Sequence, residues 1–138
     1  MLFSINEDLL LDDYFNISND KDNIMSPKQG LKLGNMFNDE YIPYKNYMPK
    51  IMEPSNEKES ALQRIRELSF AVNDLNLKLD VEPYNKNLYG LFKKYAEELN
   101  ELVMNYSKRY GALEICDDVN GTYTWYKNPW PWEGNGNV

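Results

Sequence analysis

The sequence contains no histidine and a single cysteine, Cys116. Without histidine, the chain lacks the commonest general base and the commonest zinc ligand of proteins. With one cysteine, it can form neither an internal disulfide bond nor a cysteine-cluster metal site. A Ser-His-Asp or Cys-His nucleophile is excluded as well. Composition therefore argues against most classes of enzyme, although carboxylate-based chemistry remains open. Taken with the rest of the sequence, we expect no catalytic residues, no cofactor and no metal site.

Long apolar runs and excess positive charge are also missing. The longest apolar run, Leu9-Leu10-Leu11, is far shorter than a membrane span. Glu7 and Asp8 stand where a signal peptide needs positive charge. With 15 Lys and Arg against 22 Asp and Glu, the formal net charge is −7, so no basic field predicts nucleic-acid binding. We expect a soluble, non-secreted protein with no nucleic-acid partner and no membrane span.

Aromatic residues, by contrast, are abundant, because eleven tyrosines and three tryptophans occur among 138 residues. Hydrophobic residues make up 42% of the chain, which is typical of a globular protein. Composition divides the chain into three zones. Residues 1–54 are acidic and rich in Asn, Tyr, Met and Pro, residues 55–111 are strongly periodic, and residues 112–138 are rich in Trp, Tyr, Gly, Asn and Pro.

The middle zone predicts two helices. Apolar residues recur at alternating spacings of four and three, which is a heptad pattern. In the first helix they are Ala61, Ile65, Leu68, Val72, Leu75 and Leu79. In the second they are Leu88, Phe92, Tyr95, Leu99, Leu102 and Tyr106. Ser55 or Asn56 can cap the first helix, Pro83 ends it, the second starts near Asn85, and Gly111 is a candidate left-handed cap.

Two helices joined by a short loop predict an antiparallel hairpin. We expect it to be held by Leu68, Val72, Leu75, Phe92, Tyr95 and Leu99. A lone hairpin buries little apolar surface against the entropy of ordering its backbone, so it needs another surface from its own arms, a second copy or a different protein. The predicted fold class is mainly α, an antiparallel two-helix hairpin with an extended N-terminal arm and an aromatic C-terminal arm.

Short local signals mark both arms. The spacing of apolar residues over 5–15 favours a short amphipathic helix. Ser26-Pro27 predicts the start of another helix, which Gly30 and Gly34 keep short. Prolines within 41–49 predict extended backbone. Asn120-Gly121 predicts a hairpin turn between short strands at 113–116 and 122–125.

All three tryptophans, Trp125, Trp130 and Trp132, lie close together near the C-terminus. Two of them alternate with prolines in Pro129-Trp130-Pro131-Trp132, which favours an extended form that displays the indoles. This tail either folds back over the hairpin or inserts into a partner, since tryptophan is enriched among interface hot spots. The residues leave both interpretations open.

These features together resemble the small spore-coat proteins of the cotJ operon in endospore-forming bacteria. Residues from about 56 to 133 look like CotJB, with a hairpin beginning near Leu62, a helix from about Asn85 and the closing run Asn128-Pro129-Trp130-Pro131-Trp132-Glu133. Residues 26–50, with Ser26-Pro27 and Tyr41-Ile42-Pro43-Tyr44, look like the short CotJA protein. On this resemblance the chain joins a CotJA-like arm to a CotJB-like protein.

The resemblance implies a structural protein made in the mother-cell cytoplasm and deposited in the spore coat. It also implies a partner, since the operon commonly encodes a manganese-catalase-like coat protein. Our hypothesis is an assembly adaptor that docks this protein, and the alternatives are an accessory subunit modulating that enzyme or a self-assembling coat protein. Other coat proteins and a second copy are further expected partners. The predicted partner-binding residues are Trp125, Trp130, Trp132, Leu31, Leu33, Met36 and Phe37.

The remaining reactive groups have simpler interpretations. Glu97, Glu98 and Glu101 lie off the apolar seam and no histidine accompanies them, so a solvated face is expected rather than a di-metal carboxylate site. Cys116 is expected to be a small buried or semi-exposed residue, with cross-linking between chains as the alternative. The number of tyrosines alone motivates a hypothesis of dityrosine cross-linking.

Overall fold

The computed structural model describes residues 23–50 and 53–127. Within these ranges the helices are α2 (Pro27–Leu33), the 3-10 helix η1 (Asn38–Glu40), α3 (Glu57–Val81) and α4 (Lys86–Tyr110), and no residue of them belongs to a strand. The mainly α fold class is thus confirmed. The chain forms two compact units, Met1–Ile51 and Met52–Val138. The helix predicted over 5–15 lies outside the described residues.

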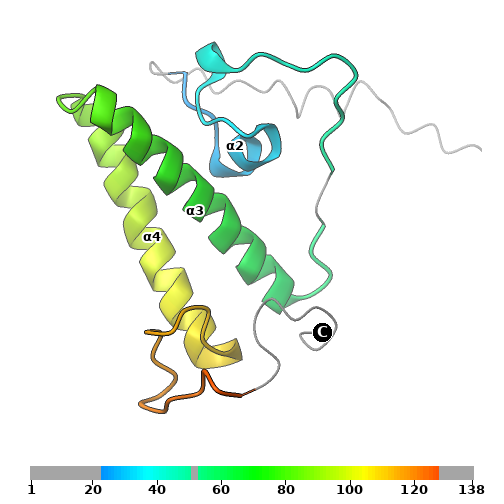
Figure 1. Cartoon of the computed structure of the whole chain (residues 1–138), viewed down its shortest axis with the longest axis vertical. Coiled ribbons are helices and arrows are strands. Elements are labelled where there is room, and N and C mark those ends of the chain that lie inside the picture. The colour runs from blue at the N-terminus through cyan, green and yellow to red at the C-terminus, as the bar shows by residue number, and fades with distance from the viewer. Residues whose placement is uncertain (1–22, 51–52, 128–138) are drawn as a thin grey trace, which may run out of the picture. The chain divides into compact units, whose positions relative to one another are not determined.

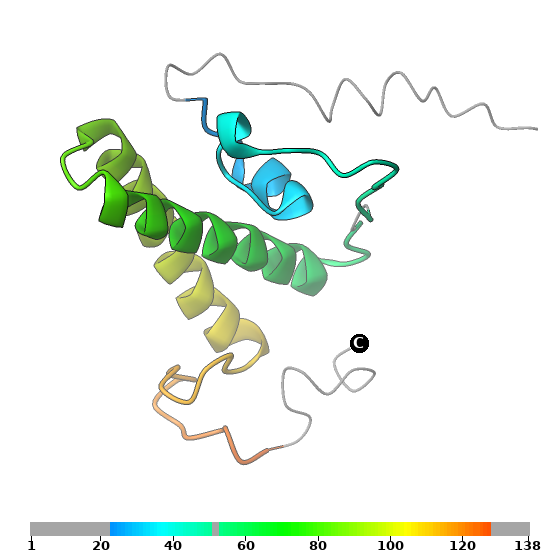
Figure 2. The same ribbon diagram turned by 45° about the horizontal axis from the view of Figure 1, so that its top comes forward.

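The second unit is built on the predicted hairpin, in which α3 and α4 lie side by side and run antiparallel (Figures 1 and 2). Asn56 rather than Ser55 is the N-cap of α3, and its side-chain oxygen accepts the Glu59 N–H at 2.8 Å. The Glu59 carboxylate in turn accepts the N–H and the hydroxyl of Ser55, both at 2.7 Å. These two hydrogen bonds lower the pKa of Glu59. Each group therefore satisfies a donor that the helix start would otherwise leave unpaired.

The loop between α3 and α4 forms at the residues where the sequence predicts it. α3 ends at Val81, one residue before Glu82-Pro83. The Asn85 side-chain oxygen accepts the Leu88 N–H at 3.1 Å and caps α4, while its amide donates to the Glu82 carboxylate at 3.2 Å. At the far end of α4, Gly111 has φ +125° and ψ 162°. The expected left-handed cap is therefore wrong there, because only φ is positive and ψ is extended.

Mainly aliphatic residues form the core of the hairpin. The buried hydrophobic residues of the two helices are Ile65, Leu68, Ala71, Leu75, Leu88 and Tyr106. Of the six residues expected to hold the hairpin, Leu68 and Leu75 are fully buried. The other four, Val72, Phe92, Tyr95 and Leu99, are half-buried. The core is therefore narrower than the heptad pattern suggests, since residues at the edges of a seam keep part of their surface exposed.

The segment after α4 contains a tight turn but no strands within its described part, 111–127. Asn120 and Gly121 have φ values of +54° and +71°, and the Thr122 N–H donates to the Val119 carbonyl at 3.1 Å. Positive φ at both central residues is the requirement of a type I′ turn. The predicted strands at 113–116 and 122–125 are wrong, because only one bridge forms, between Val119 and Thr122.

The first unit is a small loop closed around α2. The Ser26 hydroxyl accepts the Gln29 N–H at 3.3 Å, Pro27 occupies the first turn, and Gly34 forms the left-handed cap at φ +76°, so the predicted short helix is confirmed. The segments before and after α2 pair through an Ile24–Phe37 bridge. Over 41–49 the backbone is non-helical and bends once, at Asn46, which agrees with the predicted extended segment.

Candidate functional site

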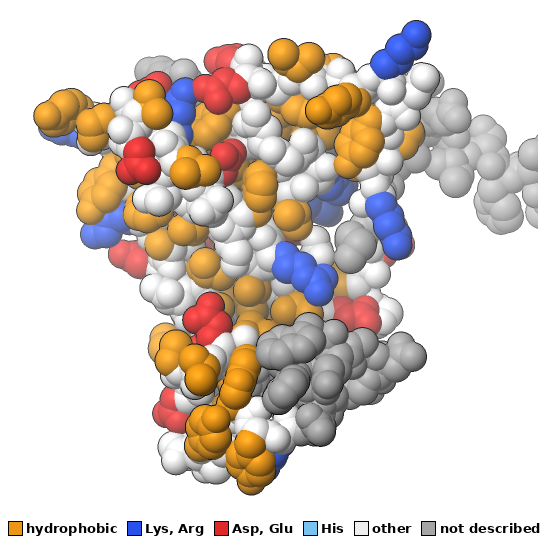
Figure 3. Space-filling view, in the orientation of Figure 1, with side chains coloured by type: hydrophobic (Ala, Val, Ile, Leu, Met, Phe, Trp, Pro, Cys, Tyr) orange, Lys and Arg blue, Asp and Glu red, His pale blue; other side chains and the backbone are white. Residues whose placement is uncertain are grey.

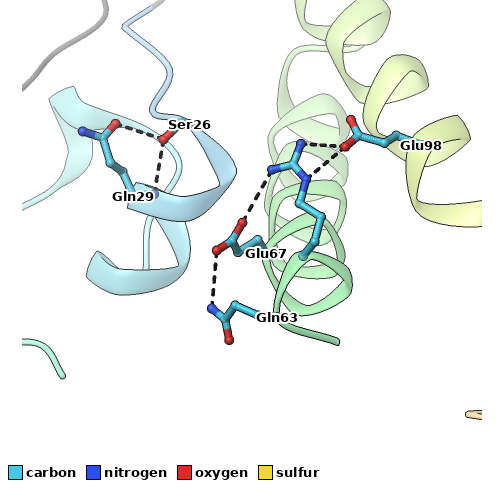
Figure 4. Close-up of polar contacts among 6 residues, drawn as sticks. Ser26, Gln29, Gln63, Glu67 and Glu98 are labelled. Carbon is cyan, nitrogen blue, oxygen red and sulfur yellow. Dashed lines mark hydrogen bonds and ion pairs between the residues drawn. The ribbon is translucent and has the colours of Figure 1, made fainter. Parts of the chain in front are cut away.

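A cluster of polar side chains crosses the hairpin at its middle (Figure 4). The Arg64 guanidinium on α3 donates to one Glu98 oxygen on α4 through Nε at 3.0 Å and Nη2 at 2.6 Å. Arg64 Nη1 also lies 3.5 Å from Glu67, which accepts a further hydrogen bond from Gln63 at 3.4 Å. A side chain of α3 thereby fixes which residue of α4 lies opposite it.

Burial and the neighbouring carboxylates determine the pKa of Arg64. Burial lowers the pKa of Arg64, but hydrogen bonds and charge from Glu98 and Glu67 outweigh that effect and leave the pKa raised. Glu67 is 7% exposed, which a carboxylate tolerates only when it is paired. Glu98 is therefore not simply part of a solvated face, as the sequence suggested, whereas Glu97 and Glu101 are exposed. The cluster joins the two helices through charged hydrogen bonds.

The predicted partner-binding residues of the first unit differ in their exposure. Met36 is fully buried and Phe37 nearly so, while Leu31 and Leu33 are half-buried. Met36 packs so closely against Gly30 that a Cβ atom at Gly30 would collide with its sulfur. The Met36 carbonyl also accepts the Met25 N–H at 2.7 Å. Met36 therefore holds the loop around α2 together.

The predicted aromatic anchor is described only at its beginning. Trp125 belongs to the second unit and is half-buried. Trp130 and Trp132 lie outside the described residues. Their partner-binding role stays a prediction, as does that of the four residues of the first unit.

Outside α3, α4 and the loop between them, two further groups of apolar side chains are exposed. In the first unit they are Ile42, Tyr44, Tyr47 and Met48. In the second unit the exposed residues that follow α4 are Ile115, Tyr123 and Tyr126. Figure 3 shows hydrophobic side chains gathered around this segment, at the lower end of the picture. The sequence signal for the second group is the aromatic content of residues 112–138, which contain two tyrosines and all three tryptophans.

Three potential ligand side chains, Glu114, Cys116 and Asp117, also come together after α4. Asp117 accepts three hydrogen bonds on one oxygen, from the Ser107 hydroxyl at 3.2 Å and from the N–H groups of Leu113 and Glu114 at 2.9 Å. These bonds attach the loop to the end of α4, and they explain why this stretch turns instead of forming the predicted strand. Cys116 is exposed.

Comparison with known proteins places most of the second unit in a family. The model of the CotJB protein family matches residues 59–133, which cover α3, α4, the Asn120-Gly121 turn and the sequence of the tryptophan tail. Residues 26–50 lie outside this match, so their likeness to CotJA stays a prediction. No curated protein and no solved structure matches the chain.

One finding bears on membranes: no helix within residues 23–50 and 53–127 is long and apolar enough to cross a bilayer.

The family match extends over more than half of the sequence and ends just beyond the Pro-Trp-Pro-Trp run. It agrees with the hairpin and with the closing motif that the sequence analysis singled out. The chain therefore belongs to the CotJB family of spore coat proteins.

Proposed function

We propose that this protein is a coat-assembly adaptor that docks a manganese-catalase-like coat protein and has no catalytic activity of its own. The observation that carries the proposal is the aromatic segment after α4. It exposes Ile115, Tyr123 and Tyr126 and continues directly into the tryptophan tail. Aromatic residues at the rim of a small helical unit are the side chains that dominate binding energy at protein interfaces.

The tyrosines of this segment form a platform. The rings of Tyr123 and Tyr126 lie 6.1 Å apart between centroids and nearly parallel, at 23°. Both are exposed, and the Lys127 ammonium lies 6.0 Å above the Tyr126 ring. The I′ turn at Asn120-Gly121 and the Asp117 hydrogen bonds hold the backbone on the N-terminal side of the platform. A surface held in place before binding loses less entropy on association.

The titratable groups support the absence of catalysis. Glu59, Arg64, Glu82 and Tyr106 are titratable groups with clearly shifted pKa values. Glu59 and Glu82 accept hydrogen bonds at helix ends, Arg64 is paired across the hairpin, and Tyr106 is shifted mainly by burial. Perturbed groups at an active site would instead converge on one accessible cleft. Here each shift has a structural explanation.

The proposal is tested by co-expressing the full chain with the manganese-catalase-like protein and measuring the native mass of the product. We expect a discrete complex containing both chains. The double variant Trp130→Ala, Trp132→Ala should retain helicity by circular dichroism and lose the partner. The matched control is Tyr84→Ala, which removes a 94% exposed aromatic ring from the loop between α3 and α4 and should leave the complex intact.

Unchanged binding by the double tryptophan variant would contradict the docking role of the tail. Failure of the wild-type chain to retain the partner would contradict the adaptor function itself. The partner's peroxide-consuming activity should be the same with and without this chain, because an adaptor tethers the enzyme without altering its active site.

A further inference from the structure

α4 carries a second heptad seam beside the one that the sequence predicted. Its members are spaced three and four residues apart in alternation. This second seam consists of Tyr89, Phe92, Ala96, Leu99, Val103 and Tyr106. It shares Phe92, Leu99 and Tyr106 with the predicted seam and is displaced to one flank of the helix. An apolar band with two overlapping seams is wider than one neighbouring helix covers.

The flank that carries the second seam is incompletely covered. Tyr89 is 52% exposed, and Phe92, Ala96, Leu99 and Val103 are half-buried, whereas Tyr106, at the C-terminal end of the seam, is buried. Among the described helices, α3 is the one that packs extensively against α4. The Tyr89 and Phe92 rings lie 6.4 Å apart between centroids and nearly parallel, and form one continuous aromatic surface at the start of the seam.

The opposite flank of α4 is closed by ion pairs. Glu98 pairs with Arg64, and Arg109 pairs with Glu57, both on α3. At 100° per residue, positions 98 and 109 lie roughly opposite to 89, 96 and 103 on the helix circumference. The two edges of α4 are therefore different: one is joined to α3 by charge, and the other presents apolar side chains.

A heptad seam is complementary to another helix with the same repeat. α4 of a second copy fits this one when the two helices run antiparallel. Ala96 then lies opposite Leu99 of the second copy, and Phe92 lies opposite its Val103. Each small or branched residue meets a larger one, and the arrangement is its own image under a twofold rotation, as a closed dimer requires.

The charges of α4 are compatible with this alignment. Glu97, Glu98 and Glu101 project more than about 100° away from the middle of the second seam, so two negatively charged chains bring no carboxylates together at the contact. Lys93, at the edge of the seam, lies near Asn100 of the second copy. Because three residues belong to both seams, the new contact would extend the existing α3–α4 interface into a four-helix arrangement.

We infer that α4 is a dimerisation helix, and that two copies of this chain associate antiparallel through the second seam. The inference goes beyond the adaptor function and does not depend on any other protein. It gives the hairpin the additional surface that a two-helix unit needs. It would also give the adaptor two copies of its aromatic segment, so that one assembled unit holds two partner-binding sites.

The test is the native mass of the full chain alone, measured by light scattering over a concentration series. We expect twice the chain mass. Ala96→Glu, in the second seam, should shift the mass to that of one chain, and so should Tyr89→Glu, which replaces an exposed side chain and leaves the hairpin core intact. The matched control Asn105→Glu adds the same charge on an exposed position away from the seam, and should remain dimeric.

The register has its own test. In a Cys116→Ser background, chains carrying Ala96→Cys are mixed with chains carrying Leu99→Cys and oxidised. The antiparallel alignment predicts that the mixed dimer is the main cross-linked product. A single-chain mass at all concentrations, an association that neither Glu variant weakens, or cross-linking mainly between identical chains would overturn the inference.

Discussion

α3 and α4 have the same length, 25 residues, and both begin with an asparagine cap, yet they bury different fractions of their apolar residues. α3 buries Ile65, Leu68, Ala71 and Leu75, together with the charged Glu67. α4 buries Leu88, Tyr106 and Ser107, and leaves most of its apolar band half-buried. Similar heptad patterns therefore do not imply similar burial.

This difference assigns the helices separate roles. α3 supplies more of the buried side chains, so changes there should act mainly on stability. α4 supplies a wide and partly exposed band, so changes along its flank should act on association. We expect variants in the core of α3 to lower the free energy of unfolding, and variants along the flank of α4 to lower the native mass.

The largest expected effect on stability comes from the core of α3. Leu68→Ala removes a fully buried side chain and should reduce the free energy of unfolding by about 2–5 kcal/mol, because the transfer term and the cavity term add. Urea unfolding followed by circular dichroism measures it. Leu77→Ala, on the exposed face of the same helix, should change the stability by less than about 0.5 kcal/mol. Equal losses in the two variants would refute the assigned core.

A smaller effect is expected at the pair between the helices. Arg64→Ala leaves buried Glu67 without its cation and should lower the free energy of unfolding by about 1–2 kcal/mol. This is less than a fully buried pair would lose, because the Arg64 side chain is 38% exposed and water screens it. Arg109→Ala breaks the exposed pair with Glu57 and should lower it by only about 0–1 kcal/mol. Urea unfolding measures the loss of stability in each variant. A loss for Arg64→Ala no greater than that for Arg109→Ala would contradict the stabilisation of buried Glu67 by Arg64.

Local signals made the helices predictable. Asn56, Pro83 and Asn85 act through bonds and steric contacts within a few residues, so the bounds of α3 and α4 follow from the sequence. The short α2 is fixed in the same way by Ser26-Pro27 and Gly34. In each case the deciding interaction closes within one or two turns of chain.

Features that depend on distant residues were not predictable. The Arg64–Glu98 pair joins positions 34 residues apart and depends on how the two helices rotate against each other. The same rotation decides which flank of α4 remains exposed. The strands expected beside Asn120-Gly121 failed for a different reason, because Asp117 takes the N–H groups of Leu113 and Glu114 that a strand would use.

The helix caps should contribute equally despite the unequal burial of the two helices. Asn56→Ala and Asn85→Ala each remove one side-chain bond to a backbone N–H, and each should lower the free energy of unfolding by about 1 kcal/mol. Asn76→Ala and Asn100→Ala, on exposed positions within the helices, are the matched controls and should be neutral or slightly stabilising. A cap loss much greater in α3 than in α4 would mean that packing, not capping, determines these values.

The smallest effect is expected at high pH, on the buried side of α4. Burial raises the pKa of Tyr106 above its usual value of 10.0, and the neighbouring Tyr110 raises it further, against an opposing effect of Arg66. The folded protein therefore holds this proton more tightly than the unfolded chain does. This contribution to stability is complete below pH 10 and is lost as the pH rises through the folded pKa. Unfolding in urea should become easier above pH 10, and Tyr106→Phe should reduce that dependence because phenylalanine has no proton to lose. Tyr84→Phe, in the exposed loop, is the control that should leave the pH profile unchanged. A wild-type stability that stays constant through this range would show that the Tyr106 phenol is accessible to water, and that the C-terminal end of α4 is less covered than its burial indicates.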